Sequence, residues 1–137
     1  MNNLEMRDQY IEHENVVNRL LKEYELHGGI VVAYDFDNTV FDYHNHGHSY
    51  EMVVELIRKL SKIKGVELIV WTGSAKERYE FVGNYLKEND IPFDKINENP
   101  YFFNSSSPKI FYSILMDDRA GLESAYGALL EFCEKVE

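Results

Sequence analysis

Three short apolar runs, each followed directly by polar residues, constrain the fold of this chain more than any other feature. Ile30–Tyr34 and Val66–Trp71 are rich in β-branched residues and are predicted to be strands buried on both faces. Ile110–Met116 has the same character, and Phe93–Ile96 is predicted to be a further short strand. Segments with apolar residues at helical spacing separate these runs. This alternation predicts an α/β fold, in which a parallel sheet has helices on both faces.

The predicted helices each combine an apolar face with a polar one. Gly28-Gly29 stops the first helix, and Ser49 is placed to cap the second. The polar, histidine-rich residues 41–48 and the Asn-, Ser- and Pro-rich residues 97–108 are predicted loops. The four predicted helices are residues 4–27, 50–63, 75–88 and 121–136.

Composition narrows the classes of function. A chain of 137 residues suits one domain over 1–137, with a first helix (1–28) appended to a core (29–137). Cys133 is the single cysteine, which excludes an intramolecular disulfide and favours a reducing, cytoplasmic location. We expect no membrane association, because no secretory signal or apolar membrane-spanning stretch is visible. A net charge of −10 disfavours non-specific nucleic-acid binding without excluding a local cationic pocket.

A polar cluster stands at the carboxyl end of each of the three longer predicted strands. Ligands bind at this edge of parallel α/β sheets, so we expect the clusters to face one crevice. Carboxylates gathered there repel one another by about 4 kcal/mol for a pair ~4 Å apart at an effective dielectric near 20. Mg²⁺ would remove this repulsion, because it prefers oxygen ligands. The clusters are Asp35-Phe36-Asp37, Thr72-Gly73-Ser74 and Asp117-Asp118.

The same strand ends carry groups that suit a phosphate. Thr72, with the backbone N–H groups of Gly73 and Ser74 at the start of a helix, is a candidate anion cradle. Lys109 precedes the last predicted strand, where an ammonium could neutralise phosphate charge. A cation, a helix N-terminus and a lysine together predict a site for phosphoryl transfer.

Asp35 and Asp37 are two positions apart at a predicted strand-to-loop bend, where their carboxylates can face different parts of one substrate. One carboxylate would attack phosphorus and form an aspartyl-phosphate. The other would protonate the leaving group and then activate the water that releases phosphate.

The run Asp35-Phe36-Asp37-Asn38-Thr39-Val40 resembles the DxDxT signature of the haloacid dehalogenase (HAD) superfamily of phosphohydrolases. Thr72, Lys109 and Asp117-Asp118 follow in the family's order, so the resemblance spans about residues 30–134. It implies a Rossmann-like three-layer sandwich with a central parallel sheet, here with an extra N-terminal helix. The cap would be minimal, because the segments between the motifs are too short for a folded lobe.

The resemblance also implies a role for each motif residue. Asp35 would be the nucleophile, and Asp37 the general acid/base with its backbone carbonyl on Mg²⁺. The implied function is a Mg²⁺-dependent phosphatase of phosphomonoesters, among them nucleotides or other bulky phosphates. Asn38 replaces the family's usual Gly, which predicts a left-handed backbone there. The predicted sets are Asp35 and Asp37 for catalysis, Thr72, Gly73 and Lys109 for phosphate, and Asp35, Asp37, Asp117 and Asp118 for the metal.

Simpler interpretations compete with several of these assignments. Thr72 and Ser74 are also ordinary helix caps, and Lys109 taken alone is an ordinary solvated lysine. The alternating run His44-Asn45-His46-Gly47-His48 is either a solvated flap that contacts substrate or a zinc site. Tyr101-Phe102-Phe103 either packs beneath its loop or stacks on a nucleobase.

At the level of function, the alternative to a phosphatase is a non-catalytic phosphate-responsive or partner-binding module. Receiver domains also gather Asp, Thr and Lys on a parallel sheet, but their acidic pair follows the first strand, whereas Asp117-Asp118 comes last. The expected partner is a phosphorylated substrate, with nucleotides, nucleic-acid ends, sugar phosphates and phosphoproteins left open. We expect the first helix to pack on the core, with homodimerisation as the alternative.

Overall fold

The computed structural model of the protein describes residues 8–136. The predicted first helix is divided into a short 3-10 turn and a longer α-helix, and its predicted start at Leu4 lies outside the described residues. In chain order the elements are η2 (Gln9–Ile11), α1 (His13–His27), β1 (Ile30–Tyr34), α2 (Glu51–Ser61), β2 (Val66–Val70), η3 (Lys76–Arg78), α3 (Tyr79–Glu88), β3 (Lys95–Ile96), β4 (Ile114–Met116) and α4 (Leu122–Val136).

The four strands form one parallel sheet in the order β3-β2-β1-β4. β1 lies near the centre, and all five of its residues are buried, as expected for a strand covered on both faces. Its first residue is paired with Val66 of β2, and Val32 is paired with Ile114 of β4. The predicted fold class is confirmed: the chain is a Rossmann-like α/β protein with a central parallel sheet flanked by helices.

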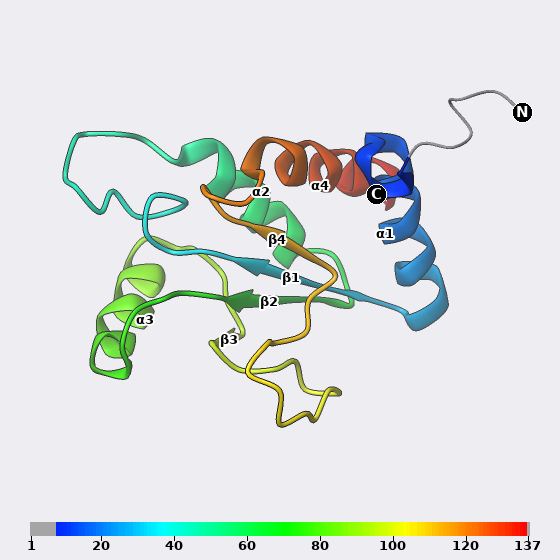
Figure 1. Ribbon diagram of the computed structural model, residues 1–137. Helices are drawn as coiled ribbons and strands as arrows, with labels where there is room; N and C mark the ends of the chain where they lie inside the picture. Colours follow the sequence, from blue (N-terminus) through cyan, green and yellow to red (C-terminus); the bar gives the residue numbers. More distant parts are fainter. Residues whose placement is uncertain (1–7, 137) are drawn as a thin grey trace, which may run out of the picture.

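The two faces of the sheet are covered differently. Val32 and Tyr34 of β1 belong to a large core that also contains buried residues of all four α-helices. Figure 1 shows α1, α2 and α4 together on one side of the strands, with the chain between β3 and β4, in yellow, on the other. On that second side Val31 and Ile69 pack against Ile110 in a smaller core. α1 contributes Val17 to the large core, so the predicted packing role of the first helix is confirmed.

The predicted last strand is shorter than expected because the first half of its segment packs against the second face of the sheet instead of pairing with β1. Ile110 is buried against the second face of the sheet, and Phe111 and Tyr112 pack beside it. Regular pairing with β1 begins at Ile114, directly after Ser113, which exchanges hydrogen bonds with the backbone of Val31. The apolar character of Ile110–Met116 therefore reflects burial throughout but strand structure only in its last three residues.

At the amino end of the sheet, two glycine-containing turns touch. The Ile30 N–H donates to the Gly65 carbonyl at 3.1 Å, which joins the starts of β1 and β2. A Cβ built on Gly29 would lie 2.0 Å from the carbonyl oxygen of Gly65, and one on Gly65 would lie 2.0 Å from that of Gly28. Only glycine allows this approach, so these residues set where the two central strands begin. Within residues 8–136, no helix has the length and apolar character needed to cross a membrane.

Candidate functional site

The loop that follows β1 turns the Asp35 side chain toward the carboxyl edge of the sheet. The Asp35 N–H still donates to the Met116 carbonyl of β4 at 2.9 Å, so its backbone remains part of the sheet. The Phe36 carbonyl then accepts hydrogen bonds from the N–H groups of residues 39, 40 and 41, which makes a compact turn. Asn38 has φ of 62° within this turn. The predicted left-handed backbone at Asn38 is thus confirmed.

Three carboxylates meet where β1 and β4 end. Asp35, Asp117 and Asp118 each offer an oxygen, and these oxygens lie within 4.8 Å of one another. The buried Thr39 hydroxyl lies between two of them, with Oγ1 3.3 Å from Asp35 Oδ2 and 3.3 Å from Asp118 Oδ1. Thr39 Oγ1 also accepts the Asp118 N–H at 3.1 Å, so Thr39 joins the first motif to the last. The structure therefore brings residues 82 positions apart into one acidic cluster.

The electrostatics of this cluster favour a bound cation. The pKa of Asp35 is raised to about 7, first by burial and then by the hydrogen bond with Asp118 and the charges of Asp117 and Asp118, while a backbone hydrogen bond partly offsets these effects. Near neutral pH the cluster thus holds a proton unless another positive charge replaces it. An all-carboxylate donor set with exposed edges fits a hard divalent ion such as Mg²⁺.

The segment after β2 is held in place by a residue that follows β3. Thr72 donates its N–H to Asn97 Oδ1 at 2.8 Å, and Asn97 Nδ2 donates to the Thr72 carbonyl at 2.7 Å. The Thr72 hydroxyl lies 3.0 Å from that of Ser74 and accepts the Ser74 N–H at 3.2 Å. Neither η3 nor α3 has a side-chain cap, so the alternative of Thr72 and Ser74 as helix caps is wrong.

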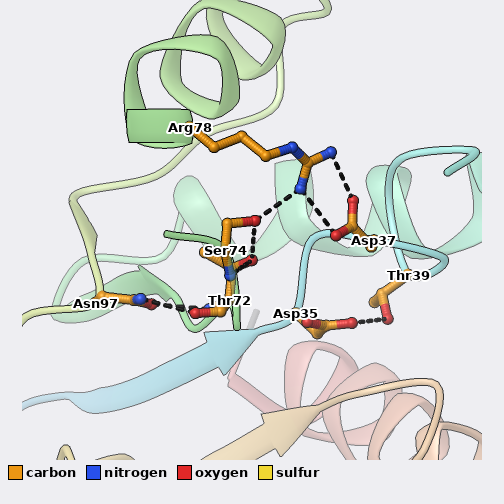
Figure 2. Close-up of polar contacts among 7 residues, drawn as sticks. All are labelled: Asp35, Asp37, Thr39, Thr72, Ser74, Arg78 and Asn97. Carbon is orange, nitrogen blue, oxygen red and sulfur yellow. Dashed lines mark hydrogen bonds and ion pairs between the residues drawn. The ribbon is translucent and has the colours of Figure 1, made fainter. Parts of the chain in front are cut away.

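Arg78 joins the segment after β2 to the loop after β1. Its Nη1 and Nη2 donate to the two Asp37 carboxylate oxygens at 2.9 and 3.0 Å, and Nη1 also donates to Ser74 Oγ at 2.7 Å. Figure 2 shows this guanidinium between Asp37 and Ser74, above Asp35 and Thr39. Sequence reasoning missed Arg78, and the signal that could have found it is its place on the first helical turns after the Thr72-Gly73-Ser74 cluster.

These groups surround an open cavity of about 540 Å³ at the carboxyl edge of the sheet. The acidic cluster, Asp37, Gly73 and Ser74 all face it, whereas Thr72 is buried just behind Ser74. Within residues 8–136, its two cationic side chains come from Arg78 and Arg119. Asp35, Asp37, Gly73, Asp117 and Asp118 are therefore brought together as predicted, with Thr72 in support.

Lys109 is a predicted site residue that the structure places away from this cavity. It is exposed, and it does not line the cavity. It lies four residues before Ser113, which bonds to Val31 early in β1, and so precedes the amino end of β4. The predicted phosphate role of Lys109 is thus not supported by its position, because the cavity opens at the other end of the strands.

The two remaining sequence features have different outcomes. His44 lines the cavity, and its ring stacks with that of His46 at 5.3 Å between centroids. The three flap imidazoles form no metal-binding group, since among residues 8–136 the acidic cluster is the one found. Phe102 and Phe103 pack against Phe111 with centroids 5.7 and 5.2 Å apart, away from the cavity. Both rings contact Phe111 yet remain exposed, Phe102 by 67% and Phe103 by 37%, so packing beneath the loop and stacking on a nucleobase both stay predictions for this run.

Comparison with known proteins supports the fold and names no function. No protein-family model matches the chain. No curated protein matches it either. A solved structure of a conserved protein from Bacteroides thetaiotaomicron aligns with a TM-score of 0.62 and 22% sequence identity. The alignment covers 80% of this chain and 93% of that one. At this identity the likeness shows a shared fold, which fits the α/β architecture described above.

Proposed function

We propose that this protein is a Mg²⁺-dependent phosphohydrolase that acts on phosphomonoesters through an aspartyl-phosphate on Asp35. The observation that carries the proposal is the convergence of Asp35, Asp117 and Asp118 within 4.8 Å at the carboxyl ends of two neighbouring strands. The neighbouring Asp37 and Gly73-Ser74 face the same cavity, as a general acid/base and a phosphate cradle must.

Asp35, Asp117 and Asp118 are the residues that would hold Mg²⁺. When bound, the ion would neutralise charge on the carboxylates and on the phosphate oxygens. The pKa of Asp35, raised to about 7 by burial and its acidic neighbours, supports this assignment, because a nucleophilic carboxylate must be ionised to attack. An enzyme working near neutral pH therefore gains from a cation at this cluster.

The chemical steps use two carboxylates and one water. An Asp35 carboxylate oxygen attacks phosphorus, and the bond from phosphorus to the leaving-group oxygen breaks as Asp37 supplies that oxygen with a proton. Asp37, now ionised, takes a proton from water, whose oxygen attacks the phosphorus of the aspartyl-phosphate. Inorganic phosphate leaves and Asp35 is restored. The backbone N–H of Gly73 would orient a phosphate oxygen, whereas the N–H of Ser74 is donated to Thr72 Oγ1.

Hydrolysis of an aryl phosphate by the purified chain, with Mg²⁺ or with a chelator, tests the proposal. We expect turnover only with Mg²⁺, and we expect Asp35→Asn to lower kcat at least about a thousandfold with the fold retained. Asp90→Asn is the matched control, because Asp90 is an exposed aspartate at the end of α3, away from the cavity. Full activity in Asp35→Asn would refute the nucleophile, and phosphate binding without turnover in the wild type would favour the non-catalytic alternative.

A further inference from the structure

The cavity contains a cation whose position no predicted motif explains. Arg78 stands between the two halves of the site, bonded to Asp37 on one side and Ser74 on the other. Its side chain is 29% exposed, so the guanidinium is sheltered while its edge reaches the cavity. The site therefore holds a fork of N–H donors where a phosphate between Asp35 and Ser74 would meet it (Figure 2).

An aromatic cage holds this guanidinium independently of Asp37. Four rings lie at similar distances from the Arg78 Cζ atom, which suits the delocalised cation better than any single contact. Because these rings bind the cation itself, the N–H edge can exchange one anion for another without the side chain leaving its place. The rings are Phe81 at 5.4 Å, Phe36 at 5.5 Å, Tyr43 at 5.6 Å and Phe41 at 5.7 Å.

Asp37 occupies the fork of Arg78 as a phosphate would. Both carboxylate oxygens accept an N–H at about 3 Å, which is the paired geometry that guanidinium also forms with two phosphate oxygens. A phosphomonoester carries more negative charge than a carboxylate. In this structure both Asp37 oxygens are bonded to Arg78. A phosphate bound to Arg78 in place of Asp37 would leave these oxygens free to act on the leaving group.

We propose that Arg78 binds the phosphate group of the substrate and exchanges Asp37 for it. The inference rests on the function proposed above and names a residue for the task that the sequence motif assigned to Lys109. It makes Arg78 a substrate-binding residue in direct contact with the phosphate.

Binding of inorganic phosphate to the full chain in the presence of Mg²⁺, measured by titration calorimetry, tests this role directly. Arg78→Ala should weaken the affinity at least about tenfold, and Arg78→Lys should recover part of the loss because it keeps the charge without the fork. Arg19→Ala is the matched control, since Arg19 pairs with Glu23 on α1 and does not line the cavity. If Arg78→Ala does not fold by circular dichroism, Arg78→Lys alone should still bind phosphate several-fold more weakly.

The Asp37→Asn background separates contact with phosphate from support of Asp37. Asp37→Asn alone should bind phosphate at least as tightly as the wild type, because a competing anion is removed. In that background Arg78→Ala should still weaken phosphate affinity about tenfold. In turnover assays on the otherwise wild-type chain, Arg78→Ala should raise KM. A loss that disappears in the Asp37→Asn background would overturn the inference, as would equal affinities of wild type and Arg78→Ala or a wild type that binds no phosphate.

The outcome also distinguishes this inference from the proposed function. Arg78-dependent phosphate binding by a protein that hydrolyses no phosphomonoester would support the role of Arg78 and refute the phosphatase. Hydrolysis with unchanged KM and phosphate affinity in Arg78→Ala would support the phosphatase and overturn the role of Arg78.

Discussion

The two ends of the sheet are built on opposite principles. At the carboxyl end, loops carry carboxylates, a left-handed Asn38 and an open polar cavity, and ionising Asp35 there is unfavourable enough to raise its pKa to about 7. At the amino end, Gly29 and Gly65 bring two backbones into close contact, next to a mainly apolar cavity of about 750 Å³. The first end has charge that a ligand can neutralise, and the second has close packing between two backbone turns. Substitutions should therefore affect activity at one end and stability at the other.

The largest effect on stability is expected at the amino end. Gly65→Ala should destabilise the protein by about 3 kcal/mol, because the new Cβ would meet the Gly28 carbonyl and the residue has φ of 91°. Denaturant unfolding would measure this loss, and the activity of the folded fraction should be unchanged. Gly83→Ala is the control, since its Cβ would make only ordinary contacts with the side chains of Ile96 and Phe93, and alanine in a helix should not lower stability. Equal stability of the two variants would break the comparison.

The next effect concerns activity at the carboxyl end. Asp37→Asn should slow esters with poor leaving groups by about a hundredfold and esters with good leaving groups far less, because only poor leaving groups need a proton. The measurement is kcat for a series of aryl and alkyl phosphates. Losses that are equal across the series would contradict the acid role of Asp37. Unfolding experiments on the same variant should show little change, which would sharpen the contrast with Gly65→Ala.

The pH dependence of stability follows from the raised pKa of Asp35. Its value of about 7 in the folded chain exceeds the ~4 of an unfolded aspartate, so the folded state alone keeps a proton between these values. The free energy of unfolding is therefore not reduced by Asp35 below about pH 4. The reduction increases between pH 4 and pH 7 and stays constant above pH 7. Without cation, Asp35→Asn should be more stable than the wild type at pH 8 and no more stable at pH 4.

Bound Mg²⁺ should remove the loss of stability that ionised Asp35 causes, so thermal unfolding with and without Mg²⁺ tests the same residue. The melting temperature of the wild type should increase by a few degrees with Mg²⁺ at pH 8, because binding competes with no proton there. The increase should be small at pH 5, where Asp35 holds its proton. Asp35→Asn should lose most of the response at pH 8. An equal response at both pH values would show that the ion binds elsewhere.

The smallest effect is expected at Lys109. Lys109→Ala should change KM and kcat less than about twofold, because the exposed lysine precedes the amino end of β4, away from the cavity. Steady-state assays beside Arg78→Ala would measure the difference between the two cations. A large loss in Lys109→Ala would break the assignment of chemistry to the carboxyl end alone.

Local patterns in the chain predicted much of the fold. The β-branched run Ile30–Tyr34 forms a strand with the predicted bounds, because continuous burial on both faces leaves a signature that needs no distant partner. The prediction of a strand over all of Ile110–Met116 was wrong, because burial of Ile110 against Val31 produces the same apolar signature without strand pairing. The predicted third strand is shortened to Lys95–Ile96, and directly before it the Leu68 N–H donates to the Asp94 side chain.

The candidate site divides in the same way. Asp35 and Asp117-Asp118 could be placed together from the chain alone, since parallel strands bring their carboxyl ends to one edge. Only the tertiary structure decided that Thr39 joins them, that Asn97 holds Thr72, and that Arg78 lines the cavity whereas Lys109 does not. The physical reason is that strand and helix preferences depend on neighbouring residues, whereas a long side chain such as arginine reaches across a loop to groups that folding alone brings near it.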